Sequence, residues 1–447
     1  MTLTLDKYLA TLSTDLNVQI VPIGQLSPYA NNPRTHSKQQ IRQIADSLKT
    51  FGWTNPILAD DEGIVIAGHG RLLAAEYLGM TEVPVIRLNG MTEAQKRAYV
   101  IADNRLAEKA GWDEEILAAE FEFLAEYDLD FDIELTGFDT GEIDVLLGAG
   151  QEQPCEEQVE LPDLAQPPVS RMGDLWQIGP HRILCGNALD ENDWKKLLGD
   201  NRVQMVFTDP PYNVAIAGNV SGLGKAQHRE FAMASGEMTH DEFVDFLHQA
   251  FALQKMFSAD RSIHYICMDW RHLVEVQTAA DGVFSELKNL CVWVKTNAGM
   301  GSFYRSQHEM VFVFKAGQGA HINNFGLGEK GRHRSNVWSY AGANTFRPGR
   351  TEDLAAHPTV KPVQMVADAI MDCSTRNGLV MDGFAGSGTT LVAAHRTGRR
   401  AAGIEIDPAY CDLSVKRLEQ ETGAQATLAG SGELFADVAA RRLAEAG

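Results

Sequence analysis

The segment LVMDGFAGSGTTLVAAHRTGRRAAGIEID, residues 379–407, constrains the fold more strongly than any other part of this chain. An apolar run ends on Asp382, a glycine-rich turn follows, a helical pattern begins at Thr389, and a second apolar run ends on Glu405. A strand, a tight turn, a helix and a second strand of this length form a βαβ unit, which belongs to a parallel sheet. The glycines let the backbone turn sharply and approach a ligand closely.

The chemistry of this turn narrows the class of ligand. GSGTT carries no lysine before its hydroxyl residues, so it is not a phosphate loop, and it does not follow the G-x-G-x-x-G pattern of dinucleotide sites. Glu405 lies 19 residues beyond Gly386, where a carboxylate can accept ribose hydroxyls. An acid at the strand end, Asp382, suits a cationic or amino-acid-bearing nucleoside better than a pyrophosphate.

Short apolar runs alternate with helical patterns over the second half of the chain. This alternation predicts an α/β, doubly wound, Rossmann-like sheet. Expected strands are 182–185, 203–207, 263–268, 290–295, 310–315, 379–382 and 401–406, with helices that include 241–256 and 389–397.

The stretch VFTDPPYNV, residues 206–214, ends a buried strand on Asp209 and follows it with Pro210 and Pro211. Proline cannot continue a strand ladder, and each proline fixes its own φ and extends the residue before it. Asp209 is therefore expected at the carboxyl end of a strand on a stiff turn, with Tyr212 just beyond.

Charge and proline content divide the chain. Residues 1–150 hold 11 Lys and Arg against 24 Asp and Glu. Residues 151–170 hold five acids, four prolines and no basic residue. The remainder of the chain has a net charge of only −3. We expect a small α+β domain at 18–148, an acidic proline-rich linker at 149–170, a catalytic domain at 171–420 and a tail at 421–447. Because the acidity lies in the N-terminal half, double-stranded DNA is not excluded as a partner of the C-terminal half.

Several classes of protein are disfavoured by composition. No run approaches the ~18 apolar residues that span a membrane, and no secretion signal is visible at the start. The six cysteines are scattered without a C-x-x-C pair, so we expect no metal site and a cytoplasmic location.

The order D-P-P-Y, then HPTVKP (357–362), DGFAGSGTT and GIEID resembles the β-class amino DNA methyltransferases, in which the catalytic tetrapeptide precedes the cofactor loop. The resemblance covers about 171–420 and implies S-adenosyl-L-methionine as cofactor. It implies a catalytic role for Asp209, Pro210, Pro211 and Tyr212. It places the cofactor among Asn187, His357, Lys361, Asp382, Phe384, Gly386, Gly388, Thr389, Glu405 and Asp407.

The chemistry of methylating an amino group accounts for the stiff acidic turn. The lone pair of an exocyclic amino nitrogen is delocalised into the base, which makes the nitrogen a poor nucleophile. The Asp209 carboxylate and the Pro210 carbonyl can accept its two N–H bonds, and fixed acceptors need little reorganisation during reaction. A base inside a duplex must be flipped out, and Tyr212 offers it a ring to stack on.

A basic and aromatic stretch at about 318–356 is the expected target-recognition region. Together with a glycine-rich loop at 218–230, it supplies the expected DNA contacts Lys225, Lys330, Arg332, Arg334 and Arg347.

Residues 31–88 resemble the ParB/sulfiredoxin-like N-terminal domain through NPR at 32–34, SLKTFGWTNPI and IVIAGHGRLLAAEYLG. Gly68 to Arg71 open a helix after a strand, which predicts an anion site. ParB proteins carry a second arginine where Gly70 stands, and no cysteine lies in this turn, so neither nucleotide hydrolysis nor sulfiredoxin activity is expected. A module that contacts DNA or a partner without catalysis is favoured.

The favoured function is site-specific methylation of the N6 atom of adenine in DNA, since an aspartate at the first motif position is typical of adenine enzymes in this family. Cytosine-N4 methylation by the same site, and a ParB-like DNA-binding or partition module with an inactive methylase domain, are the alternatives. A cognate restriction endonuclease and a homodimer are compatible with the family; no membrane partner is expected.

Overall fold

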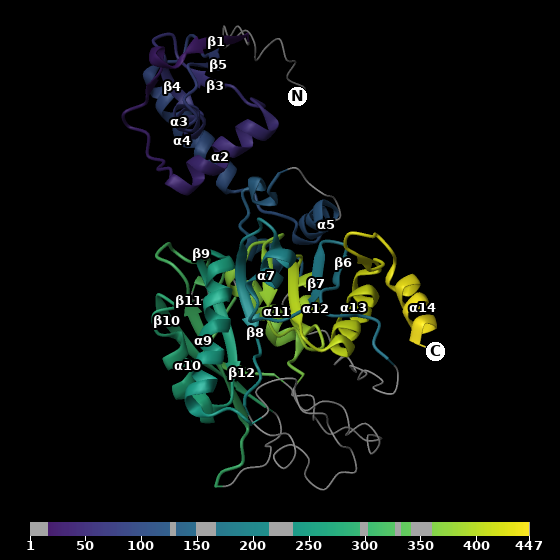
Figure 1. Ribbon diagram of the computed structural model, residues 1–447. Coiled ribbons are helices and arrows are strands. Elements are labelled where there is room, and N and C mark those ends of the chain that lie inside the picture. The colour runs from purple at the N-terminus through teal and green to yellow at the C-terminus, as the bar shows by residue number, and fades with distance from the viewer. Residues whose placement is uncertain are drawn as a thin grey trace. The chain divides into compact units, whose positions relative to one another are not determined.

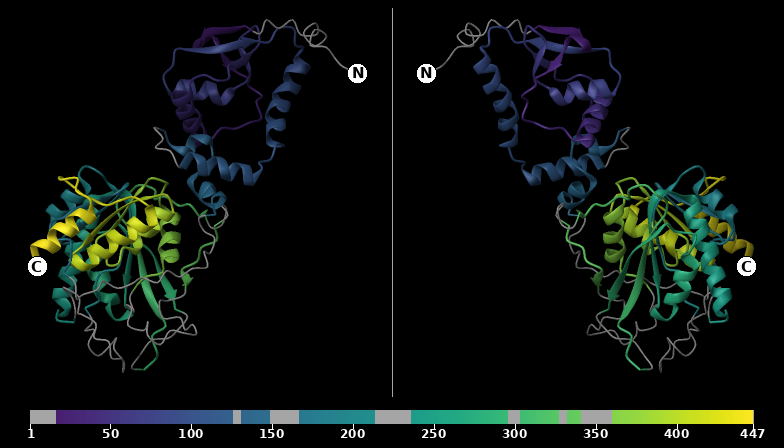
Figure 2. Two further views of the ribbon diagram at one scale, coloured as in Figure 1. Left: turned by 90° about the vertical axis from the view of Figure 1, so that its right-hand side faces the viewer. Right: turned by 90° about the vertical axis from the view of Figure 1, so that its left-hand side faces the viewer.

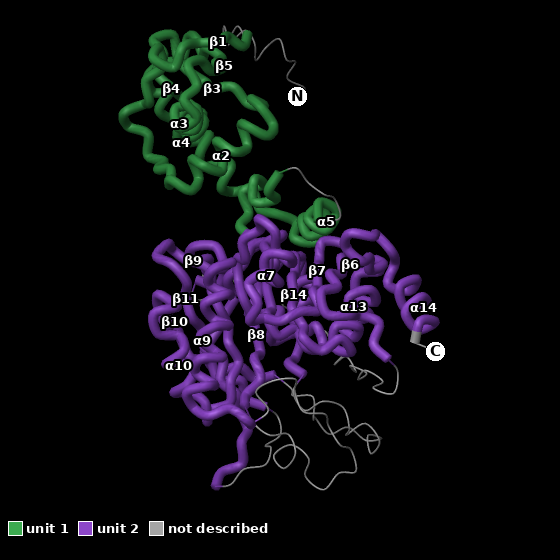
Figure 3. The backbone as a smooth tube through the Cα atoms, viewed as in Figure 1, with its two compact units in different colours: residues 1–139 green, residues 140–447 purple. Residues whose placement is uncertain are grey.

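The computed structural model describes residues 17–125, 131–148, 167–213, 236–295, 303–326, 332–340 and 360–446. The chain divides into two compact units, residues 1–139 and 140–447 (Figure 3). Among the described residues, no helix is long and apolar enough to cross a membrane.

The first unit is built on a five-stranded sheet in the order β1-β5-β3-β4-β2. Its strands are β1 (Val18–Pro22), β2 (Ser27–Pro28), β3 (Ile57–Ala59), β4 (Ile64–Ala67) and β5 (Glu82–Arg87). Its helices are η1 (Ile23–Gln25), α2 (Lys38–Phe51), α3 (His69–Tyr77), α4 (Glu93–Glu108), α5 (Glu114–Ala125) and η2 (Ile133–Thr136). The ends of α2 follow from local chemistry, because the Ser37 side chain accepts from Gln40 N and Gly52 adopts a φ of 72° beyond the last turn.

The second unit, which contains β6 to β12 as labelled in Figure 1, is built on a ten-stranded sheet. Its strand order is β12-β10-β11-β9-β8-β13-β14-β7-β6-β15. The strands are β6 (Leu175–Ile178), β7 (His181–Cys185), β8 (Val203–Thr208), β9 (Ser258–Met268), β10 (Glu286–Val294), β11 (His308–Lys315), β12 (Val337–Ser339), β13 (Leu379–Asp382), β14 (Arg400–Glu405) and β15 (Thr427–Leu428). The central strands β9, β8, β13, β14 and β7 are mutually parallel, and β11 and β6 pair antiparallel at either side. The predicted α/β doubly wound sheet is confirmed.

Helices cover both faces of this sheet (Figure 2). The helices of this unit are α6 (Thr140–Leu146), α7 (Glu191–Leu198), α9 (His240–Phe257), η3 (Trp270–His272), α10 (Leu273–Ala280), α11 (Val363–Cys373), α12 (Thr389–Arg396), α13 (Pro408–Thr422) and α14 (Phe435–Ala446). Side chains of β8 alternate between the two layers: Met205 and Phe207 pack with α11, α12 and α13, whereas Val206 packs with α7 and α9. Burial on both faces explains the nearly unbroken apolar runs of the central strands.

The chain order of the strands creates a switch point at the centre of the sheet. From β13 the chain passes through α12 to β14 on one side, while the earlier strand β8 lies on the other side of β13. In open α/β sheets, ligands bind beyond the carboxyl ends of strands at such a point. The carboxyl ends of β8 and β13 carry Thr208 with Asp209, and Asp382.

Two boundaries differ from those expected from the sequence. Helix α6, expected in the N-terminal domain, belongs to the second unit, because its Asp144 is fully buried in an ion pair with Arg399. The expected tail after 420 is part of the fold, since β15 pairs with β6 and Phe435 of α14 contacts Trp176 with ring centroids 4.9 Å apart.

Candidate active site

The strand that ends in Asp209 and the strand that ends in Asp382 lie side by side. Their register pairs Met381 with Val206, and the Thr208 hydroxyl donates to Asp382 Oδ1 at 2.9 Å. The catalytic turn and the glycine turn therefore leave the same edge of the sheet next to each other.

Asp382 holds the glycine turn through hydrogen bonds. Its carboxylate accepts from the Thr390 hydroxyl at 2.7 Å, from the Phe384 backbone N–H at 3.0 Å and from Thr208. Burial raises the pKa of Asp382 to about 6, although these three donors pull it down. The side chain is thus a buried acceptor that holds the turn in shape.

Glu405 lies across the turn at the end of β14. Its Oε2 accepts from Gly386 N at 2.7 Å and its Oε1 from Asp407 N at 2.8 Å, while burial raises the pKa of this carboxyl group to about 7. A carboxylate has about four lone-pair positions, so two backbone donors leave acceptor capacity for ligand hydroxyls. Asp407 itself accepts from Ala409 N and caps α13.

The two glycines of the turn have different requirements. Gly388 adopts a φ of 79°, and a Cβ there would lie 2.8 Å from Ser414 Oγ, so close packing requires glycine. Gly386 adopts a φ of 52°, and a Cβ there would meet only Phe384 O at 3.9 Å. Open space above Gly386 is what a closely approaching ligand needs. Thr389, the first residue of α12, is buried beside Gly388.

Asn187 follows β7 at the same edge. Gly186 N donates to Glu405 O at 2.9 Å, which holds the end of β7 against the end of β14. The Asn187 side-chain oxygen accepts from Leu189 N at 3.0 Å. The structure therefore gathers Asn187, Asp382, Glu405 and the glycine turn around one edge of the sheet.

The catalytic turn is closed by a network of charged and hydroxyl groups. Tyr212 OH donates to Asp209 Oδ1 at 2.6 Å, and Lys361 Nζ donates to Asp209 Oδ2 at 2.5 Å. Burial raises the pKa of Asp209, an effect that the neighbouring ammonium of Lys361 opposes. Burial also raises the pKa of Tyr212 well above its usual value, so its hydroxyl keeps its proton.

Sequence reasoning missed Glu309 and Lys295. Glu309 of β11 accepts from Lys295 Nζ at 2.5 Å and from Lys361 Nζ at 3.1 Å, and Lys361 and Lys295 outweigh the effect of burial and lower its pKa to about 2. The available signal was an acid inside the otherwise apolar strand HEMVFVFK. The ammonium group of Lys361, a residue expected beside the cofactor, contacts Asp209 and Tyr212 of the catalytic turn.

Two of the expected DNA contacts are corrected by the structure. Arg332 donates to Asp372 Oδ1 at 2.8 Å and Arg334 to Asp372 Oδ2 at 2.9 Å, and their side chains are 9% and 16% exposed. Guanidinium groups held in this way stabilise α11 rather than reach for phosphates. The remaining expected DNA contacts, Lys225, Lys330 and Arg347, lie outside the described residues, and so does His357, which was expected beside the cofactor.

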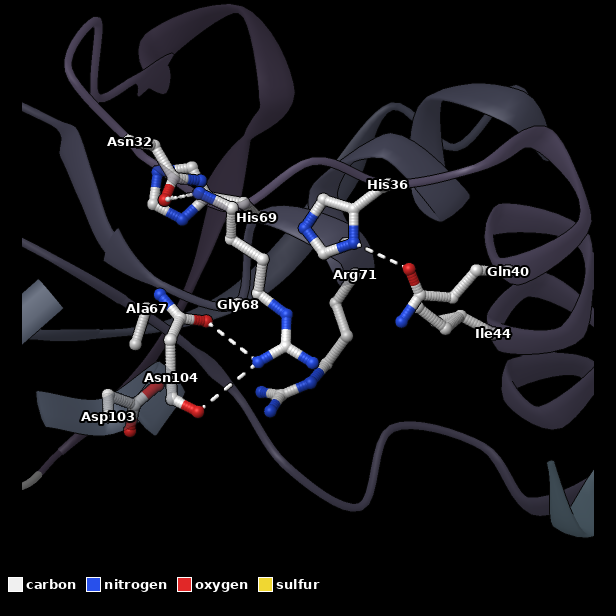
Figure 4. Close-up of a pocket in the computed structure, with 12 residues that line it drawn as sticks. Asn32, His36, Gln40, Ile44, Ala67, Gly68, His69, Arg71, Asp103 and Asn104 are labelled. Carbon is white, nitrogen blue, oxygen red and sulfur yellow. Dashed lines mark hydrogen bonds between the residues drawn. The ribbon is translucent and has the colours of Figure 1, made fainter. Parts of the chain in front are cut away.

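The first unit has a separate cavity of about 220 Å³ (Figure 4). The turn Gly68 to Arg71 lines one side, and residues of α2, α4 and the segment before α2 line the rest: Asn32, Arg34, His36, Gln40, Ile44, Asp103 and Asn104. A Cβ on Gly70 would lie 2.9 Å from Ile44 Cδ1 and 3.1 Å from His36 Cε1, so His36 occupies the space that a side chain at Gly70 would need. Burial lowers the pKa of His69, which favours a neutral ring. Within the described residues, no cluster of three or more His, Cys, Asp or Glu side chains could hold a metal ion.

Three families match successive parts of the chain: ParB N-terminal domain over residues 10–104, ParB-methyltransferase HTH domain over 115–172, and DNA methylase of the N6/N4 type over 203–416. The chain contains a DNA methylase domain of the N6/N4 type and carries ParB-type domains ahead of it. It is a DNA methyltransferase. The HTH domain has no counterpart among the features predicted from the sequence patterns.

Individual relatives are similar either to the ParB-like part or to the methylase part of the chain. A ParB-like nuclease domain-containing protein, YnaK of Escherichia coli strain K12, is 54% identical over 86 residues, 19% of this chain and 99% of that protein. The type II methyltransferase M2.DpnII of Streptococcus pneumoniae is 27% identical over 49% of this chain and 83% of that protein. The crystal structure of the M1.HpyAVI–SAM complex covers 53% of this chain and 98% of that one, with 19% identity and a TM-score of 0.39.

Proposed function

We propose that this protein transfers a methyl group from S-adenosyl-L-methionine to the exocyclic N6 of adenine in double-stranded DNA. The observation that carries the proposal is the junction of the two turns. Asp209 and the glycine turn leave adjacent strand ends, tied by the hydrogen bond from Thr208 to Asp382. An acceptor for the target amino group therefore lies next to the cofactor turn.

The residues at this edge fit S-adenosylmethionine, the cofactor of this family. Open space above Gly386 suits close approach of the ligand to the backbone, and Glu405 has acceptor capacity for ribose hydroxyls. Asn187 lies at the end of β7 beside Glu405, where an amide can meet an adenine edge. Phe384 adds a half-buried ring next to the turn. When bound, the cofactor supplies the electrophilic methyl group.

The protein's own part in the reaction is to hold the amino group. The Asp209 carboxylate and the Pro210 carbonyl are acceptors fixed by two prolines, so they can hold both N–H bonds and localise the nitrogen lone pair. Tyr212, with its ring half-buried beside Asp209, offers a stacking face for a base flipped out of the duplex. Aspartate at the first motif position favours adenine over cytosine.

The division of the chain into domains is also a proposal. We assign the ParB-like domain to the first unit, a helix-turn-helix region to about 115–172, and the methylase to the sheet that begins with β6. Target recognition is assigned to about 318–356, of which residues 327–331 and 341–356 lie outside the described residues.

The decisive experiment combines the full chain with methyl-labelled S-adenosylmethionine and unmethylated double-stranded DNA, followed by mass spectrometry of the nucleosides. N6-methyl-deoxyadenosine is the expected product. Asp209→Ala should lower its rate by about a hundredfold or more, while the cofactor affinity by calorimetry stays within a few-fold. Asp200→Ala, which removes an exposed acid on the turn before β8, is the matched control. Label in N4-methyl-deoxycytidine would assign the cytosine alternative, and no label in DNA would overturn the proposal.

A further inference from the structure

Lys361 uses every donor that its ammonium group has. An ammonium group has three N–H donors, and Lys361 Nζ lies 2.5 Å from Asp209 Oδ2, 3.1 Å from Glu309 Oε2 and 3.1 Å from Tyr212 OH. The side chain is only 6% exposed, and Pro362 and the start of α11 follow directly. Its position is therefore fixed by three partners and by the backbone.

The Tyr212 hydroxyl has one proton and two carboxylates within reach. It lies 2.6 Å from Asp209 Oδ1 and 3.2 Å from Glu309 Oε2. In the structure the shorter contact is to Asp209. Each oxygen of Asp209 thus already accepts one hydrogen bond, Oδ1 from a neutral hydroxyl and Oδ2 from an ammonium group.

A target amino group needs one of these two oxygens. Both bonds go to an ionised carboxylate, but Lys361 carries a full opposite charge, whereas the Tyr212 hydroxyl is a neutral donor and is held less strongly. The hydroxyl is the partner that the amino group displaces more readily. A buried hydroxyl without an acceptor is costly, and Glu309 is already close enough to accept it.

We propose that Lys361 and Glu309 are positioning residues for methyl transfer: Lys361 fixes the Asp209 carboxylate through Oδ2, and Glu309 accepts the Tyr212 hydroxyl when the target amino group takes Oδ1. This inference rests on the proposed function. It moves Lys361 from the cofactor side of the site to the side of the base.

The charges around the cluster are consistent with this arrangement. Asp209 and Glu309 face Lys361 and Lys295, two acids against two cations. Cys267 of β9 lies near them, and burial raises the pKa of its thiol well above the usual value, so it adds no charge. Asp382 contributes a further negative potential from β13. Lys361 is the cation that the two acids share.

The first test uses the pH dependence of kcat for Lys361→Met and Lys361→Arg in the full chain. Without the ammonium group, the adjacent carboxylates of Asp209 and Glu309 raise each other's pKa, so activity is lost at higher pH on the acid side. We expect Lys361→Met to lower kcat at least about tenfold. The pH at which kcat falls on the acid side of its pH profile (the acid limb) should rise by about one unit or more. Lys361→Arg keeps the charge and should retain the wild-type limb. Lys361→Gln replaces the methionine variant if that variant fails to bind S-adenosylmethionine.

The second test separates the acceptor role of Glu309 from its charge. Glu309→Gln keeps an acceptor oxygen and Glu309→Met removes it. With Tyr212 present, the glutamine variant should have a kcat about tenfold above that of the methionine variant. In a Tyr212→Phe background there is no hydroxyl to accept, and the two variants should be within about twofold of each other.

Three results would overturn the inference while the methyl transfer itself stands. They are an unmoved acid limb in Lys361→Met, a change confined to the KM for S-adenosylmethionine, and an equal Gln-to-Met ratio at position 309 in both backgrounds. Failure of the wild-type protein to methylate any DNA would instead overturn the proposed function together with the inference.

Discussion

The Thr208 hydroxyl donates to Asp382 Oδ1 at 2.9 Å, and this bond joins the strand of the catalytic turn to the strand of the glycine turn. Thr208 is fully buried and immediately precedes Asp209, while Asp382 immediately precedes the glycine turn. A shift of one strand end relative to the other would change the distance between the acceptor for the base and the site of the cofactor. This buried side-chain contact therefore adds to the pairing of β8 with β13 in positioning the two halves of the site.

Replacing Thr208 by valine tests that contact. Thr208→Val keeps the side-chain volume but removes one of the three donors to Asp382, so we expect a loss of about 1 kcal/mol in the free energy of unfolding. Because Asp382 holds the glycine turn in shape, the lost hydrogen bond should also weaken the binding of S-adenosylmethionine, by about fivefold in calorimetry. Thr397→Val is the control, because Thr397 is equally buried but donates to the backbone of α12. Equal effects of both variants on cofactor affinity would show that the contact has no special role.

The raised pKa values of Asp382 and Glu405 predict opposite effects of pH on stability and on cofactor binding. Their folded-state pKa values of about 6 and about 7 exceed the ordinary values of 3.8 and 4.5. Between pH 4.5 and 7 the folded chain therefore binds more protons than the unfolded chain, and the contribution of these groups to stability rises as pH falls.

Cofactor affinity should change the other way, because ribose hydroxyls donate to an ionised carboxylate. From pH 8 to pH 5.5 we expect the affinity for S-adenosylmethionine to fall by about tenfold or more. Glu405→Gln removes one titrating group and should reduce both trends, as measured by calorimetry and by thermal unfolding. A wild-type affinity that does not depend on pH would remove Glu405 from the cofactor site.

Local patterns were sufficient to predict the centre of the molecule. The order of acid, glycines and helix start in 379–407, and the two prolines after Asp209, determine turns through their own backbone preferences. Partners distant in the sequence were not predictable in this way. The sequence around Arg332 indicates a basic surface, but in the fold Arg332 pairs with Asp372 of α11. The role of Glu309 likewise follows only from the fold, which places β11 beside Lys361.

Arg332 is expected to support the fold rather than DNA affinity. Removing the guanidinium leaves Asp372, whose side chain is 4% exposed, with a partly uncompensated buried charge, so Arg332→Ala should cost about 3–5 kcal/mol in unfolding free energy. The slope of DNA affinity against salt concentration should stay as in the wild type. Lys288→Ala, which breaks an exposed pair with Glu286, should cost less than about 0.5 kcal/mol. A flattened salt dependence in Arg332→Ala would restore Arg332 to the DNA contacts.

The boundary of the methylase unit gives the last prediction. Asp144 of α6 accepts from Arg399 Nη1 at 2.9 Å and Nη2 at 2.8 Å, and both side chains are fully buried. Arg376 adds a contact to Asp144 at 3.1 Å. A chain that begins at residue 161 lacks this aspartate and the whole of α6, so Arg399 loses the carboxylate that accepts two of its hydrogen bonds. We expect it to be about 3–5 kcal/mol less stable in denaturant unfolding than a chain that begins at residue 140.

Asp144→Asn in the full chain separates the charge from the rest of α6. It should reproduce most of the loss, because the amide keeps the shape of the side chain but not its charge. Equal stability of the two truncated chains would mean that α6 is dispensable for the second unit and that the methylase folds from the first strand of its own sheet. If only the chain that begins at residue 161 is destabilised, residues 140–146 are part of the enzyme's fold, although they lie within the range that matches the ParB-methyltransferase HTH domain.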